Sequence, residues 1–132
     1  MWKGRFSEDP DARVQAFTQS LDLDWRLAAA DLRGSVAHVR MLGAVGLLSP
    51  EEARTLEEHL EGVGEEIRTG VLAPRAELED VHMTIEARLT ERCGPLGARI
   101  HMGRSRNDQV ATALRLHLRG VILALQDDLD EL

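Results

Sequence analysis

The sequence predicts an all-α fold, and its composition and periodicity both support that prediction. All the aromatic residues lie within the first 25 positions, at Trp2, Phe6, Phe17 and Trp25. Any core further along must therefore be built from Leu, Val, Ile, Ala and Met, which suits packed helices better than a sheet. Apolar residues also recur at helical spacing in several segments, some of them behind clear helix start signals. The 132 residues are enough for one domain.

Charge and cysteine content exclude several classes of protein. The formal net charge of −7 argues against a nucleic-acid binder, which would usually be basic. Cys93 is the only cysteine, so no internal disulfide can form, and a reducing, cytoplasmic location is expected. No segment approaches the ~18 apolar residues of a membrane span. Residues 1–6 also lack the apolar region of a secretory signal.

The first half of the chain is expected to form an arm and three helices. Residues 1–9 read as the arm, and Asp9-Pro10 fits the start of a short helix that ends near Ser20. That helix would bury Val14, Phe17 and Leu21. A longer helix is expected over residues 22–46, with an apolar stripe at Leu32, Val36, Val39, Met41 and Leu42.

The clearest helix start lies at residues 49–52. Ser49 can cap the helix, Pro50 occupies its first position, and Glu52 completes a capping box. We expect this helix to end near Gly70. Its buried stripe would consist of Ala53, Leu56, Leu60, Val63 and Ile67.

The second half is expected to hold two more helices. One begins around Glu79-Asp80 and stops at Gly94-Pro95, with Val81, Ile85 and Leu89 buried. Residues 94–105 contain three glycines and a proline and should be irregular. A last helix begins near Asn107 and still continues its pattern where the sequence stops, which favours a truncated chain. Its apolar stripe Val110, Leu114, Val121 and Leu125 would be exposed in a monomer.

The most distinctive stretch is residues 101–109, where a glycine-bearing loop enters a helix. Free backbone N–H groups and the positive end of the helix dipole meet there and favour an anion. Arg104 and Arg106 add planar, fixed-charge donors that can grip a carboxylate or phosphate. Ser105 or Asn107 can cap the helix, and Asn107 can also contact a ligand. The alternative is a capped helix with two solvated arginines.

Other polar groups have weaker claims to function. Asp80 near a helix start fits a cap. His82 and Glu86 lie one turn apart and could share a metal or a proton, but no further His or Cys stands at ligand spacing. We therefore favour a structural helix pair and predict no metal site. Taken alone, Ser20 is interpreted as a helix-end or capping hydroxyl. The segment 31–38 resembles a close-packed helix crossing, where Gly34 and Ser35 let another backbone approach.

Taken together, these segments resemble the N-terminal region of the argininosuccinate lyase family. The resemblance covers essentially the whole chain. It runs from residues 2–6 (the family usually has W-G-G-R-F) through residues 31–38 and 79–89 to the highly specific stretch 103–110. Lys3 departs from the family pattern by replacing a glycine, and Met102 by replacing the threonine before Gly103.

The resemblance implies the fold, reaction and assembly of the superfamily that includes fumarase, aspartase and adenylosuccinate lyase. These are homotetramers built around a long-helix bundle, with each active site assembled from three subunits. Residues 1–105 would form an N-terminal helical domain, and residues 106–132 would begin a bundle helix. The family eliminates arginine from argininosuccinate and releases fumarate, without a cofactor, in arginine biosynthesis.

The resemblance also assigns substrate-binding roles. Ser20 and Asn107 match substrate-binding positions, Arg106 matches an arginine at the dicarboxylate end, and Asp80 and Arg104 match site-lining or supporting positions. The family's catalytic histidine and serine lie in later segments, so residues 1–132 alone are expected to be inactive. The alternatives are a sibling fumarate-releasing lyase and a shortened, non-catalytic relative that acts as an assembly partner. RNA or phosphate binding through Arg104 and Arg106 is disfavoured by the acidic net charge.

Overall fold

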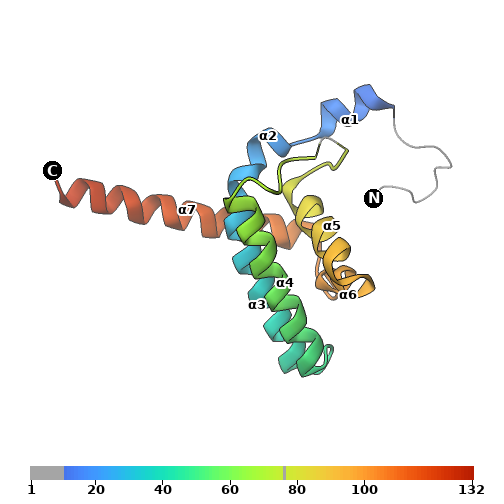
Figure 1. The fold of residues 1–132 in the computed structure, drawn as a ribbon. Helices are drawn as coiled ribbons and strands as arrows, with labels where there is room; N and C mark the ends of the chain where they lie inside the picture. Colours follow the sequence, from blue (N-terminus) through green and yellow to red (C-terminus); the bar gives the residue numbers. More distant parts are fainter. Residues whose placement is uncertain (1–10, 76) are drawn as a thin grey trace.

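The fold of the described residues, 11–75 and 77–132, consists of helices, with no strand among them (Figure 1). It is seen in a computed structural model of the chain. The all-α prediction is confirmed for this part of the chain. The predicted arm at residues 1–9 and the start signal Asp9-Pro10 lie outside the described residues. Among the helices that are described, none is long and apolar enough to span a bilayer.

The first helix, α1 (Ala12–Thr18), contributes less to the core than its sequence predicted. Val14 is 52% exposed and Phe17 is 90% exposed, so the prediction that both are buried is wrong. Figure 1 shows α1 at the edge of the molecule, away from the helices that enclose the core. Leu21, in α2 (Leu21–Asp24), is buried as predicted.

The long helix predicted over residues 22–46 is divided in the structure. After α2 the chain tightens into the 3₁₀ turn η1 (Trp25–Leu27) and continues as α3 (Ala28–Ala44). Backbone angles stay in the helical region across the junction, so the break is a local change of pitch rather than a turn. Val39 and Leu42 are fully buried, whereas Met41 is 43% exposed and so lies off the buried face of α3.

The helix α4 (Pro50–Arg68) has the capping box that its sequence predicted. The Glu52 backbone N–H donates to Ser49 Oγ at 3.1 Å, and the Ser49 N–H donates to Glu52 Oε2 at 2.7 Å. Ala53, Leu56, Leu60 and Val63 are buried along one face. Figure 1 shows α3 and α4 side by side as an antiparallel pair.

The region between α5 (Val81–Cys93) and the last helix is more regular than predicted. Residues 95–101 form the short helix α6 (Pro95–Ala98) and the 3₁₀ turn η2 (Arg99–His101), so the expectation of an irregular segment is wrong. Pro95 fits the first turn of a helix, and Gly97 allows α6 to pack closely on α5. A Cβ at Gly97 would lie 2.6 Å from the backbone N and Cα of Thr90.

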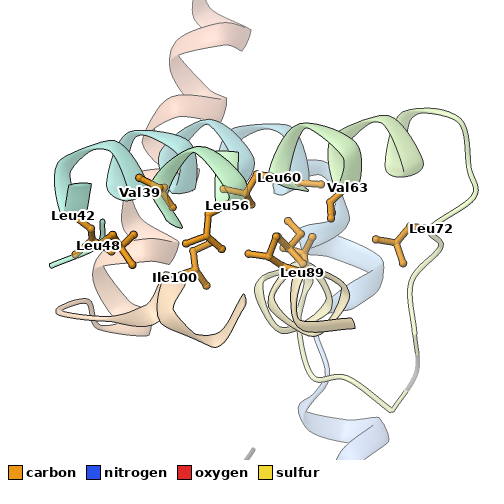
Figure 2. Packing of buried hydrophobic residues seen from close by; sticks show 13 residues of the cluster. Val39, Leu42, Leu48, Leu56, Leu60, Val63, Leu72, Leu89 and Ile100 are labelled. Carbon is orange, nitrogen blue, oxygen red and sulfur yellow. The ribbon is translucent and has the colours of Figure 1, made fainter. Parts of the chain in front are cut away.

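The hydrophobic core lies between the α3–α4 pair on one side and α5 with η2 on the other. Figure 2 shows Leu56, Leu60 and Val63 directed from α4 toward Leu89 and Ile100. Leu48, in the turn between α3 and α4, and Leu72, in the loop after α4, close the cluster at two of its edges. The aliphatic core that composition predicted is therefore confirmed.

The last helix, α7 (Arg106–Asp130), packs against α3 near its start and then leaves the body of the molecule (Figure 1). Gln109 and Ala113 are its only buried residues. The exposure predicted for its apolar stripe is confirmed, since Leu114 is 45%, Val121 51% and Leu125 56% exposed. This leaves a long apolar surface on α7 uncovered by the described residues.

Replacing Gly97 with Ala is expected to lower the free energy of unfolding by about 1–3 kcal/mol, because the new methyl group overlaps the α5 backbone. Gly120 is a matched control within α7, where an added Cβ meets nothing within 4 Å among the described residues. Gly120→Ala should instead raise stability, by up to about 1 kcal/mol. Denaturant unfolding followed by circular dichroism measures both. Equal effects of the two substitutions would contradict the packing of α6 on α5.

Candidate functional site

The turn before α7, residues 103–105, is held by hydrogen bonds at each of its ends. Met102 precedes it, and its carbonyl oxygen accepts a hydrogen bond from His38 Nε2 at 2.9 Å. Gly103 has a φ of 66°, a left-handed conformation that glycine adopts without strain. Ser105 is the helix cap: its side chain accepts from the Asn107 N–H, and its own N–H donates to Asp108 Oδ2 at 2.8 Å. Some of the backbone N–H groups that were expected to face an anion are therefore already hydrogen-bonded within the protein.

Arg104 points into the protein rather than toward solvent. Its side chain is 6% exposed, and Nη1 donates to Ser35 Oγ at 3.2 Å. Burial lowers the pKa of the Arg104 guanidinium, and the nearby carboxylates of Asp31 and Asp108 partly oppose that shift. α3 does pack on α7, but a Cβ at Gly34 would meet only side-chain atoms, the nearest being Thr112 Cγ2 at an ordinary 3.7 Å, so the close backbone approach predicted at Gly34 is not observed. Arg104 is therefore held by contacts inside the protein and is not directed toward solvent.

Arg106 is the arginine of the turn that reaches the surface, with its side chain 30% exposed. Its Nη1 donates to Gln109 Oε1 at 2.5 Å, and its Nη2 donates to Glu86 Oε2 at 3.3 Å. Nε lies 3.8 Å from Asp80 Oδ2. The two arginines thus face different surroundings, because Arg104 contacts Ser35 whereas Arg106 contacts Gln109 and Glu86. Arg106 instead joins the start of α7 to α5.

Ser20 is tied to the start of α5, next to Asp80. Its N–H donates to the Glu79 carbonyl at 3.0 Å, and its hydroxyl donates to Asp24 Oδ2 at 2.5 Å. The other oxygen of Asp24 accepts the Val81 N–H at 3.1 Å. Ser20 stands at the N-cap position of α2, which agrees with its interpretation as a helix-end residue, but its side chain makes no capping hydrogen bond.

Three of the five predicted site residues, Ser20, Asp80 and Arg106, lie together at the beginning of α5. Asp80 caps that helix by accepting the Met83 N–H at 2.6 Å, as predicted. Ser20 is bonded to the residue before Asp80, and Arg106 lies within ion-pair distance of Asp80 itself. Asn107 is exposed beside Arg106 at the first turn of α7. A hydroxyl, carboxylates and a guanidinium thus lie in one region, whereas Arg104 contacts Ser35 on α3.

A buried polar cluster lies beneath this region and was not predicted from the sequence. Asp31 is 1% exposed and His82 is 2% exposed, with Asp31 Oδ1 3.0 Å from His82 Nδ1. Gln109 Nε2 donates to the same oxygen at 2.9 Å. His82 faces Asp31, whereas Glu86 Oε2 accepts a hydrogen bond from Arg106 Nη2 at 3.3 Å. No group of three or more metal-ligating side chains occurs among the residues that the structure describes.

One signal in the sequence could have located this cluster. Asp31 shares a helix face with Ala28 and Ser35, which stand three residues before it and four residues after it, and both are buried. A carboxylate on a buried face requires polar partners, so the position itself predicts a polar contact between helices. The sequence does not show that His82 and Gln109 provide it.

Comparison with known proteins covers almost the whole chain. Residues 4–132 match the lyase family. The chain belongs to this family. The argininosuccinate lyase of Methylococcus capsulatus is 52% identical to this lyase chain over 139 residues, which is 100% of the chain and 30% of the relative. That of Thioalkalivibrio sulfidiphilus is 51% identical over 132 residues, or 28% of the relative. That of Thermus thermophilus is 54% identical over 121 residues, or 92% of the chain and 26% of the relative.

These comparisons confirm the resemblance to the argininosuccinate lyase family that the motifs indicated, because all three relatives carry that name. This lyase chain spans less than a third of the length of the curated relatives it matches, since the shares of those relatives are 30%, 28% and 26%. This chain is therefore similar to only one part of each of those longer relatives.

The different surroundings of the two arginines predict different effects on stability. Arg104→Met should lower the free energy of unfolding by about 3 kcal/mol, because Arg104 is a buried cation facing buried polar partners. Arg106→Met should change it by no more than about 1 kcal/mol, because this side chain is partly exposed. Urea unfolding of the two variants under identical conditions measures the difference. A larger loss at Arg106 than at Arg104 would contradict these assignments.

Proposed function

We propose that this chain is the substrate-binding, N-terminal part of an argininosuccinate lyase, which eliminates arginine from argininosuccinate and releases fumarate in arginine biosynthesis. One observation carries the proposal: relatives of that name, 49% to 54% identical, align with 92% to 100% of the chain. The polar groups around the start of α5 support it, because they suit a small substrate that bears both carboxylates and a guanidinium.

In this proposal Arg106 holds a carboxylate of the dicarboxylate end of the substrate. A guanidinium has five N–H donors, so its contacts with Gln109, Glu86 and Asp80 leave donors for a bidentate carboxylate. Elimination places extra negative charge on the carboxylate next to the carbon that loses its proton. A fixed donor aimed at that charge lowers the barrier by binding the transition state more tightly than the substrate.

The remaining site residues have complementary roles. Ser20 and Asn107 supply hydrogen-bonding groups to the substrate, Asp80 lines the site, and Arg104 supports the turn from behind. We assign no catalytic acid or base, no metal and no cofactor to this segment. Residues 1–132 by themselves are therefore expected to bind substrate groups without turning substrate over.

The proposal includes an assembly and a location. Residues 1–105 form the N-terminal helical domain, and residues 106–132 begin a helix of the central bundle of a cytoplasmic homotetramer. The exposed apolar residues along α7 support this division, because a bundle helix needs such a face to pack against other helices. Neither nucleic acid nor a membrane is among the partners proposed.

The first test is fumarate release by the protein as its own cells make it, with the intact mass measured on the same sample. We expect fumarate from argininosuccinate, little or none from adenylosuccinate, and a mass well above that of 132 residues. Purified residues 1–132 should release none. Preference for adenylosuccinate would identify a sibling lyase. An inactive protein with the mass of 132 residues would instead indicate a shortened, non-catalytic relative.

A second test concerns Arg106 in the intact enzyme. Arg106→Ala removes a charge-assisted contact worth about 2–4 kcal/mol in the transition state, so turnover should fall by roughly two orders of magnitude. Circular dichroism should show nearly unchanged folding. Arg54→Ala is the control, because Arg54 is an exposed arginine on α4 and should leave turnover unaffected. Normal kinetics for Arg106→Ala, or an unfolded variant, would contradict the role given to Arg106.

A further inference from the structure

We propose that Gln109 is a positioning residue, which fixes the Arg106 guanidinium relative to the buried Asp31 carboxylate and so aims Arg106 at the substrate. This inference rests on the proposed function, because it concerns how the same arginine meets a substrate carboxylate. It adds a residue that contacts no substrate itself.

The Gln109 amide bridges the two charged groups. Its side chain is buried, with the residue 5% exposed. Nε2 donates to Asp31 Oδ1 at 2.9 Å, and Oε1 accepts from Arg106 Nη1 at 2.5 Å. A carboxylate can only accept and a guanidinium can only donate, so just one orientation of the amide satisfies both neighbours. A residue of this length that lacked either the donor or the acceptor would break the bridge.

Asp31 is a rigid anchor for this bridge. It lies on α3, is 1% exposed, and its Oδ1 also lies 3.0 Å from His82 Nδ1 on α5. Three helices therefore meet at one carboxylate oxygen, since Gln109 comes from α7. Arg106 is three residues before Gln109. Through Gln109 it is held by contacts with the body of the protein, and not by the turn alone.

The neutral character of Gln109 distinguishes it from the other partners of Arg106. Glu86 and Asp80 are carboxylates, at 3.3 Å and 3.8 Å from the guanidinium, and both compensate its charge. Gln109 makes the shortest of the three contacts and holds the guanidinium without adding negative charge. Because the guanidinium keeps that contact when an anion arrives, its remaining donors stay directed while the substrate carboxylate competes with Glu86 and Asp80.

The test is a double-mutant cycle on the full-length enzyme, with kcat and KM for fumarate release as the readout. Gln109→Met keeps the side-chain length and removes both hydrogen bonds. It should lower kcat/KM on the order of tenfold or more, mainly through kcat. In an Arg106→Ala background the same change should cost less than about twofold, because the group that Gln109 positions is gone. Equal losses in the two backgrounds would overturn the proposal.

Controls separate this role from a loss of stability and from failure of the proposed function. Val63→Ala, in the core contributed by α4, lowers stability without touching the bridge and should leave kcat/KM within about twofold. If Gln109→Met fails to fold, Gln109→Asn shortens the amide, breaks at least one contact and should reproduce the non-additive loss. An active wild-type enzyme with an additive cycle overturns only the positioning role. A wild-type enzyme that does not act on argininosuccinate overturns both.

Discussion

The Asp31 carboxylate is buried where α3, α5 and α7 meet, and its surroundings constrain how these helices pack. A carboxylate at 1% exposure is costly unless polar groups face it. His82 on α5 and Gln109 on α7 both face its Oδ1, and the positive charge of Arg104 lies close by. None of these groups comes from α3 itself. The burial of Asp31 is therefore tolerable only when α5 and α7 are docked correctly. The packing of these helices and the compensation of the buried carboxylate thus depend on each other.

The same constraint separates the roles of the two arginines in the turn. Arg104 is directed inward to Ser35, and burial lowers its pKa, whereas Arg106 remains partly exposed beside Asp80 and Glu86. Ser105 stands between them as the helix cap, with its backbone extended at φ −100° and ψ 148°. One arginine thus completes the interior, and the other is available to a ligand. Under the proposed function, this arrangement holds Arg106 on a fixed support beside the substrate.

Features that depend on neighbouring residues were predictable from the sequence, and features that depend on distant ones were not. The capping box at Ser49 and Glu52 and the cap at Asp80 are local, and both were predicted correctly. The order in α6 depends on the close approach of Gly97 to Thr90, and the burial of Asp31 depends on His82 and Gln109. Helical periodicity predicted that Phe17 is buried, whereas it is exposed, because periodicity cannot show whether another element covers that face of the helix.

Asp31 and Gln109 act as one unit that couples α3 to α7. The most direct test is the interaction energy between Asp31→Asn and Gln109→Met, from the free energies of unfolding of wild type, both single variants and the double variant. The bond has a charged acceptor and is buried, so a coupling of about 1–2 kcal/mol is predicted. Effects that add to within about 0.5 kcal/mol would contradict the claim and leave the two residues as independent neighbours.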